Sequence, residues 1–335
     1  MLTSRDIALK AGVSPSTVSR AFDPDSPISK ETRDNILKIS KEMGYSPNIL
    51  ASSLKTKNSG LIGVIFTDSS NNFLSSVLKD LAFHADLYGY RVIVMYSNDN
   101  AVIESKHLQT MLSLGVDGVI LMPAMFSNNS ATQQILAQYK YQNTPVLQCF
   151  AHINSNLHTL SIDDRMSSFA ATKSLLNMGH RNIIFVDNKK NVISDSKITG
   201  YTTAFEQCGI PCKRDFIIQV PSCVDPKNIL KEQIKALKTT AIITANESLT
   251  ISALKAFKEL NLSYPDDISI ISFDDSDWLS LLNITAIAVP SGEVGNRMAS
   301  LLINELIKAS YQEPYIFSEI EPILINRNSV KNLHV

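Results

Sequence analysis

Seven short, unbroken apolar runs between residues 61 and 273 constrain the fold of this chain most strongly. Strands buried on both faces have such runs, because neither face of the sheet meets water. The runs alternate with segments of helical length, for example 73–88 and 101–114, as in parallel sheets covered by helices. They fall into two sets: 61–66, 91–96, 118–123 and 145–150, then 182–186, 241–245 and 268–273. We therefore predict an α/β fold with two doubly wound parallel sheets.

Residues 3–22, TSRDIALKAGVSPSTVSRAF, have the pattern of two short helices around a tight turn. Thr3 is suited to cap the first helix and Gly12 to end it, and Ser14 and Pro15 suit the start of a second helix. Short hydroxyl side chains and one arginine occupy the outer side of that second helix. The pattern predicts a helix-turn-helix that reads a DNA major groove, although any short helical hairpin shares it.

The charge distribution has the sign expected for a DNA-binding amino-terminal part. Residues 1–60 hold nine Lys or Arg against six Asp or Glu, a net charge of +3, and the remainder carries −4. A basic head on an acidic body suits a protein that meets phosphates. Residues 48–54, NILASSL, form a fairly apolar segment that is too short for a stable isolated helix, and the alternative is a plain linker.

Motifs for membrane insertion, nucleotide binding and catalysis are missing from the sequence. No run reaches the roughly 18 apolar residues of a membrane span, and the first residues are polar. GxGxxG, GxxxxGK[ST], GxSxG and HExxH do not occur, and the four cysteines lack CxxC spacing. We therefore expect a cytoplasmic protein that is not an enzyme, with no cofactor, no metal site and no membrane partner.

From end to end, the chain resembles the lactose-repressor/galactose-repressor (LacI/GalR) family of transcription regulators. Its first part, with the segments TSRDIALKAGVSPSTVSRAF, ISKETRDNILKISKEMGYSPN and LASSLK, resembles the DNA-binding headpiece. The resemblance continues in family order through GHRNIIFV (179–186), ISIISFDD (268–275) and IEPILINRNS (320–329). It implies a homodimeric repressor of a palindromic operator, controlled by a small carbohydrate-derived effector: a sugar, a sugar acid or a phosphosugar.

The resemblance also implies a domain organisation. Residues 1–46 would be the headpiece, 47–60 a hinge helix and linker, and 61–335 a two-lobed core like the periplasmic sugar-binding proteins. The amino lobe would hold about 61–161 and 291–321, and the carboxyl lobe about 162–290 and 322–335. The chain would cross between the lobes three times, and the cleft between them would bind the ligand.

The residues that the resemblance places on DNA lie in the headpiece and in the hinge. Leu54 matches the leucine that the family inserts between base pairs from the minor groove. Ser52 stands where an arginine is often found, which removes one contact. The full set of predicted DNA-binding residues is Thr3, Ser14, Pro15, Ser16, Thr17, Ser19, Arg20, Asn48, Ala51, Leu54 and Lys55.

Predicted ligand-binding residues follow strands or open helices of the core. The carboxyl ends of its strands offer Thr67-Asp68-Ser69, Asn246-Glu247 and Asp274-Asp275. Asn246 and Asp274 match polar pocket residues of the family, where amide and carboxylate groups bind sugar hydroxyls. The alternative is a loop amide and a capping carboxylate. Asn71 and Phe73 lie in SSNNFL, which resembles the family's SNPFF loop with Asn72 in place of proline. Phe73 would stack on an apolar ligand face or belong to the core.

Two departures from the family bear on the ligand. Lys197 stands where the family has a ligand-clamping arginine, and it replaces a bidentate fork by a compact charge. Cys149 stands where sugar-binding members often have aspartate, which removes a hydroxyl acceptor. Together they favour an anionic ligand over a neutral hexose.

Three functional classes fit a two-lobed protein of this kind: a ligand-controlled repressor, a free solute-binding protein and a phosphosugar enzyme. The headpiece argues against the second class, and the missing catalytic motifs argue against the third. DNA binding would separate the first from both.

Overall fold

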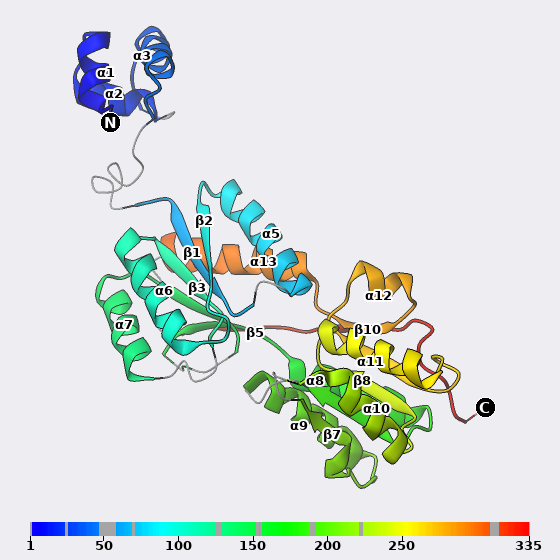
Figure 1. Cartoon of the computed structure of the whole chain (residues 1–335). Helices are drawn as coiled ribbons and strands as arrows, with labels where there is room; N and C mark the ends of the chain where they lie inside the picture. Colours follow the sequence, from blue (N-terminus) through cyan, green and yellow to red (C-terminus); the bar gives the residue numbers. More distant parts are fainter. Residues whose placement is uncertain are drawn as a thin grey trace. The chain divides into compact units, whose positions relative to one another are not determined.

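The chain divides into two units, Met1–Gly60 and Leu61–Val335, in the computed structural model (Figure 1). The structure describes residues 2–23, 26–46, 58–68, 71–124, 129–151, 154, 156–187, 192–220, 224–308 and 315–334. The first unit is helical in its described part, and the second contains two six-stranded sheets. The predicted fold class, α/β with a small helical headpiece, is confirmed.

Three helices form the first unit: α1 (Ser4–Ala11), α2 (Pro15–Ala21) and α3 (Lys30–Met43). The Asp6 carboxylate accepts hydrogen bonds from the backbone N–H and the hydroxyl of Thr3, which fixes the start of α1. Gly12 ends α1 at a φ of +68°, in the left-handed region that glycine adopts without steric cost. The Ser14 hydroxyl caps α2 by accepting from the Thr17 N–H. The three helices enclose a small core of Ile7, Ala8, Val18, Ala21 and Ile36.

The first sheet of the second unit has the order β11-β5-β4-β3-β1-β2, and all its strands are parallel. With its covering helices it is called the amino lobe. Helices α5 and α13 pack against one face and α6 and α7 against the other, each over its own apolar core (Figure 1). The strands are β1 (Leu61–Phe66), β2 (Arg91–Tyr96), β3 (Gly118–Leu121), β4 (Val146–Phe150), β5 (His158–Ile162) and β11 (Phe317–Ile320). The helices are α5 (Asn72–Leu87), α6 (Ala101–Leu114), α7 (Ser130–Tyr141), α13 (Ser291–Ser300) and the π-helical η2 (Leu301–Lys308).

The second sheet has the order β12-β10-β9-β8-β6-β7 and, with its helices, is called the carboxyl lobe. Its strands are parallel except for β12, which is antiparallel to β10 at the edge. The strands are β6 (Ile183–Asp187), β7 (Ile217–Gln219), β8 (Ala241–Thr244), β9 (Ser269–Phe273), β10 (Thr285–Ala288) and β12 (Ile323–Ile325). The helices are α8 (Asp164–Asn177), α9 (Val192–Gln207), η1 (Arg214–Phe216), α10 (Pro226–Ala236), α11 (Glu247–Leu260) and α12 (Asp277–Leu281).

The chain passes between the two sheets at three places. These are the steps from β5 to α8, from β10 to α13 and from β11 to β12. The resemblance puts the lobe crossings close to the same places. The predicted boundaries of the headpiece, hinge and lobes stay predictions.

Two helix pairs pack unusually closely because glycine lies at the contact. A Cβ atom on Gly200 of α9 would lie 2.9 Å from the backbone N of Phe169 in α8, and closer still to the carbonyl oxygen of Arg165. A Cβ atom on Gly295 of α13 would lie 2.7 Å from backbone atoms of α5. Only glycine allows these approaches, so α8–α9 and α5–α13 form tight pairs beside their sheets.

Candidate functional site

A cavity of about 290 Å³ lies in the second unit, lined by residues of both lobes. Much of its lining comes from the carboxyl ends of strands, where parallel α/β sheets hold ligands. All five side chains predicted to bind a ligand line it: Asn71, Phe73, Lys197, Asn246 and Asp274. Their gathering around one cavity does not test binding, so their role as ligand contacts stays a prediction.

Aromatic rings form an apolar wall on the amino-lobe side of the cavity. The Phe73 and Phe150 ring centroids are 5.8 Å apart, and Phe73 also packs against the amino-lobe core. The Asn71 side chain accepts a hydrogen bond from the Leu74 N–H at 3.2 Å and thereby caps α5. Phe73 is thus half-buried and lines the cavity at the same time, so the two alternatives weighed for it are compatible.

Lys197 is the buried basic group on the carboxyl-lobe side. Its Nζ donates to the carbonyl oxygen of Ala245 at 3.1 Å and lies 3.6 Å from Oδ1 of Asp164. The same ammonium lies 4.2 Å from the ring centroid of Phe273, a cation–π distance. The close α8–α9 packing at Gly200, one turn from Lys197, brings Lys197 to Asp164, because the two side chains belong to these two helices.

The ammonium of Lys197 is surrounded by carboxylates. Burial alone would lower the pKa of Lys197, but the nearby charges of Asp164, Asp274 and Asp187 outweigh burial and raise it. Burial raises the pKa of Asp164 to about 6, although Lys197 opposes the shift. Burial also raises the pKa of Asp274, with Lys197 opposing and Glu247 adding to the rise. The positive charge of Lys197 is therefore compensated inside the protein.

The charges around Lys197 bear on the expectation of an anionic ligand, which stays a prediction. The described lining contains one basic side chain, Lys197, and five acidic ones: Asp68, Asp164, Asp187, Glu247 and Asp274. A sugar acid or phosphosugar would add negative charge beside these carboxylates, where Asp274 already adds to the raised pKa of Asp164 and Glu247 to that of Asp274. Lys189 and Lys190, which follow Asp187 in the sequence, lie outside the described residues.

Cys149 is the second departure from the family that bears on the ligand. Its thiol is fully buried in β4, where burial raises its pKa well above the ordinary value, and it is not part of the cavity lining. The next residue, Phe150, lines the cavity instead. The expected loss of a hydroxyl acceptor at Cys149 is offset because Asp164 and Asp187 supply carboxylates to the cavity.

Asn246 and Asp274 follow neighbouring strands of the carboxyl lobe. The Asn246 side chain accepts from the Leu249 N–H at 3.0 Å, so it caps α11 while it lines the cavity. Asp274 follows β9 at a φ of +64°, in the left-handed region that Asp and Asn tolerate better than most residues.

Sequence analysis missed two acidic residues of the lining, Asp164 and Asp187. Asp187 stands at the end of β6, the kind of strand end where ligand groups were sought. That position was the available signal. Their relation to Lys197 and to the amino lobe depends on contacts between distant segments, which local pattern does not reveal.

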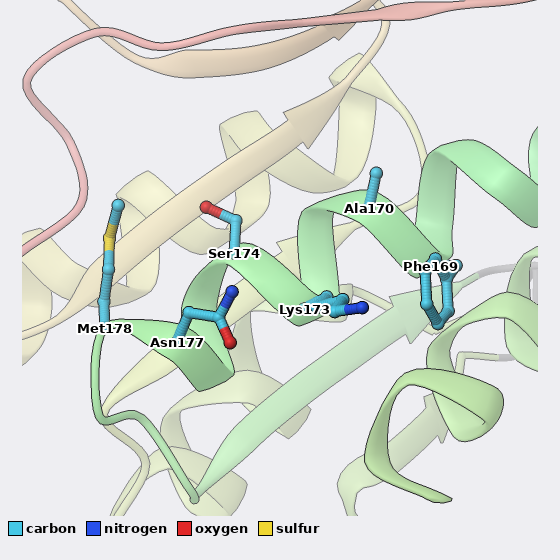
Figure 2. A pocket seen from close by; sticks show the side chains of 6 residues that line it. All are labelled: Phe169, Ala170, Lys173, Ser174, Asn177 and Met178. Atoms are coloured by element: carbon cyan, nitrogen blue, oxygen red, sulfur yellow. The ribbon is translucent and has the colours of Figure 1, made fainter. Parts of the chain in front are cut away.

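A second cavity, of about 450 Å³, lies along one helix of the carboxyl lobe (Figure 2). Its six lining residues are Phe169, Ala170, Lys173, Ser174, Asn177 and Met178. They come from α8 and the residue after it, and the Lys173 ammonium lies 5.2 Å from the Phe169 ring centroid. This hollow lacks converging polar groups from several strands, so the cavity between the lobes is the better candidate.

The predicted DNA-reading residues of the headpiece stand on one accessible helix and the turn before it. Ser14, Pro15, Ser16, Ser19 and Arg20 are exposed, as is Thr3, and Thr17 is half-buried. The Ser14 hydroxyl bonds those of Ser16 at 2.7 Å and Thr17 at 2.8 Å, which ties the start of α2 together. The hinge residues Asn48, Ala51, Leu54 and Lys55 lie outside the described residues.

Comparison with known proteins decides the family. A family profile described as "Bacterial regulatory proteins, lacI family" matches residues 3–48, and one described as "Periplasmic binding protein-like domain" matches residues 172–330. The "Probable HTH-type transcriptional regulator EndR" of Paenibacillus polymyxa is 30% identical over 349 residues, which cover 99% of each chain. The chain belongs to the LacI family. It is a DNA-binding transcription regulator, and relatives such as EndR are regulators and not enzymes.

Solved structures agree on the fold of this LacI-family chain. The lac repressor dimer bound to operator and the anti-inducer ONPF matches with a TM-score of 0.83 at 21% identity, over 98% of this chain and 99% of that one. A LacI family regulator from Enterococcus faecium with bound ribose matches with a TM-score of 0.68 at 22% identity, over 82% and 99%. In the described part of the chain, no helix is long and apolar enough to cross a membrane.

Proposed function

We propose that this LacI-family regulator is a homodimeric repressor whose operator affinity is controlled by a small carbohydrate in the cavity between the lobes. The observation that carries the proposal is the cavity itself. Residues of both lobes line it, so a ligand there contacts two bodies joined by three chain crossings. Such a ligand changes the balance between lobe arrangements by its different affinity for each.

The DNA contacts in this proposal come from the headpiece and the hinge. Helix α2 enters the major groove with Pro15, Ser16 and Arg20 toward the bases, and Leu54 of each hinge enters the minor groove. A dimer with two such heads requires a palindromic operator. Its partner is chromosomal DNA, so the protein acts in the cytoplasm. The exposure of α2 and the capped turn before it support this role.

The charges of the cavity support a neutral sugar as the effector. A neutral polyhydroxylated sugar can use Asn246, Asp274 and the carboxylates around Lys197 as hydrogen-bond acceptors without adding charge. Its apolar face can lie on Phe73. The E. faecium relative with bound ribose is consistent with a neutral sugar. A sugar acid or phosphosugar is disfavoured because Lys197 is already compensated by buried carboxylates.

Two measurements test the proposal. Thermal-shift assays on the full chain compare each neutral sugar with its own acid and phosphate, for example glucose, gluconate and glucose 6-phosphate. A ligand bound only by the folded state raises the melting temperature, so neutral sugars should raise it more than their charged forms. A preference for the charged members of each set would reject the effector class.

DNA binding is tested by selecting sites from random duplexes and repeating the titration with Arg20→Ala. We expect this variant to lose about 1–3 kcal/mol of operator affinity and to relax preference at one symmetric base pair. Arg91→Ala, an exposed arginine of the second unit, is the matched control. Unchanged sequence preference in Arg20→Ala would remove Arg20 from the reading edge.

A further inference from the structure

One acidic side chain of the cavity joins the two lobes directly. Oε2 of Glu247, the first residue of α11, accepts a hydrogen bond from Nδ2 of Asn72 at 3.0 Å. Asn72 is the first residue of α5 and belongs to the amino lobe, whereas Glu247 belongs to the carboxyl lobe. The indole N–H of Trp278 in α12 donates to the other oxygen, Oε1. Both carboxylate oxygens are therefore engaged, one within the lobe and one across the cavity.

The position of each group suits this contact. Glu247 opens α11, where the positive end of the helix favours a carboxylate. Trp278 is half-buried and holds the carboxylate from its own lobe, which reduces the side-chain freedom that Glu247 loses on meeting Asn72. Glu247 also lines the cavity, so the contact stands at the ligand site and not at a remote edge.

Asn72, which donates the interlobe hydrogen bond, stands at a position where this chain departs from the family pattern. The family's loop has proline where this chain has Asn72, and proline has no side-chain donor. The interlobe hydrogen bond therefore depends on a residue that the family pattern lacks. The hydrogen bond is charge-assisted, and it lies at an exposed position where water competes with it.

We propose that Asn72, Glu247 and Trp278 form an interlobe latch that holds the two lobes together in the absence of effector. The latch rests on the proposed function only in that it regulates the same cavity. The latch favours one lobe arrangement before any ligand binds. It therefore raises the apparent affinity for a ligand that binds this arrangement, and it reduces the shift in lobe populations that such a ligand can cause.

The variant Asn72→Pro tests the latch with little risk to folding. Proline is favoured at the first residue of a helix, and Asn71 before it has φ −81° and ψ 116°, close to the extended conformation that proline requires. The substitution restores the family residue and removes the interlobe donor alone. The control is Asn177→Ala, an exposed asparagine of α8 outside the cavity between the lobes.

The readout is acrylamide quenching of Trp278 in the full chain without ligand, since this is the only tryptophan. Because this hydrogen bond is exposed, its loss should shift the ratio of latched to open lobes by roughly two- to tenfold. We expect stronger quenching in Asn72→Pro and wild-type quenching in Asn177→Ala. The neutral sugar found by thermal shift should return the quenching of Asn72→Pro toward the wild-type value.

Wild-type quenching in Asn72→Pro would reject the latch, and equal changes in both variants would also reject it. Neither result concerns DNA. If the wild-type chain selects no duplex site while Asn72→Pro still changes the quenching, the proposed function fails and the latch stands.

Discussion

Lys197 is the residue on which the chemistry of the cavity depends. A lysine in this position acts as a point charge, and its three carboxylate neighbours, Asp164, Asp187 and Asp274, leave that charge fully matched. The carbonyl of Ala245 and the ring of Phe273 further orient the ammonium. Lys197 therefore compensates several carboxylates that lie close together. In the proposed function, these carboxylates then accept hydrogen bonds from the sugar.

Replacing Lys197 by Met should destabilise the fold strongly. The variant leaves the buried Asp164 and the half-buried Asp274 without their cation, and breaking a buried pair such as Lys197–Asp164 costs about 3–5 kcal/mol. The control is Lys255→Met, an exposed lysine of α11, for which a change within about 0.5 kcal/mol is expected. Urea unfolding of both variants measures the difference. Equal stabilities would mean that Lys197 is not needed to compensate the carboxylates.

The sequence predicted the residues of the cavity only where the family resemblance names them. Asn71, Phe73, Lys197, Asn246 and Asp274 all line it. The expectation of an anionic ligand stays a prediction, and it considered Lys197 without its neighbours. Asp164 and Asp187 come from α8 and β6, and nothing in the local pattern around Lys197 indicates that they meet it.

At the scale of elements, apolar periodicity predicted the buried strands and missed the rest. Each of the seven apolar runs coincides with a strand to within two residues at either end. The missed strands are short or partly polar, such as β5 (HTLSI), β11 (FSEI) and the three-residue β7. They pair because a neighbouring strand offers backbone hydrogen bonds, and such tertiary context is not encoded in their own periodicity.

The α8–α9 pair supplies a test at the same scale. Gly200→Ala forces a Cβ atom against the backbone of Arg165 and Phe169, which cannot move without separating the helices. We expect a loss of about 1–3 kcal/mol in the free energy of unfolding. We also expect weaker binding of the sugar effector, because Lys197 lies one turn away on α9.

Gly292→Ala is the matched control for Gly200→Ala. It lies in helix α13, where the added Cβ would meet Oδ2 of Asp80 at an ordinary 3.5 Å. There the gain in helix propensity should make alanine neutral or stabilising by about 0.5–1 kcal/mol. If both variants lose stability equally, close packing at Gly200 is not what fixes the helix pair.

For the whole molecule, the proposed mechanism places effector binding and DNA binding in different parts of the chain. The cavity lies in the second unit, and Leu54 lies in the predicted hinge before it. Coupling between two such sites is ordinarily about 1–3 kcal/mol, a change of roughly 5–150-fold in operator affinity. Because this coupling is reciprocal, operator DNA should change the affinity for the effector by the same factor.

Two substitutions should therefore each weaken the binding of a different ligand. Asp274→Asn removes the charge, and asparagine tolerates the φ of +64° as aspartate does. We expect it to lower the affinity for the effector by about tenfold or more. The operator affinity measured without effector should stay nearly unchanged. Leu54→Ala should weaken operator binding, because the wedge between base pairs is lost, and leave effector affinity of the DNA-free protein unchanged. Titrating effector and operator separately against both variants gives four affinities. Lower effector affinity in DNA-free Leu54→Ala, or a full effector response in Asp274→Asn, would contradict the separation of effector site and DNA site. Each result would require one residue to act at the other's site.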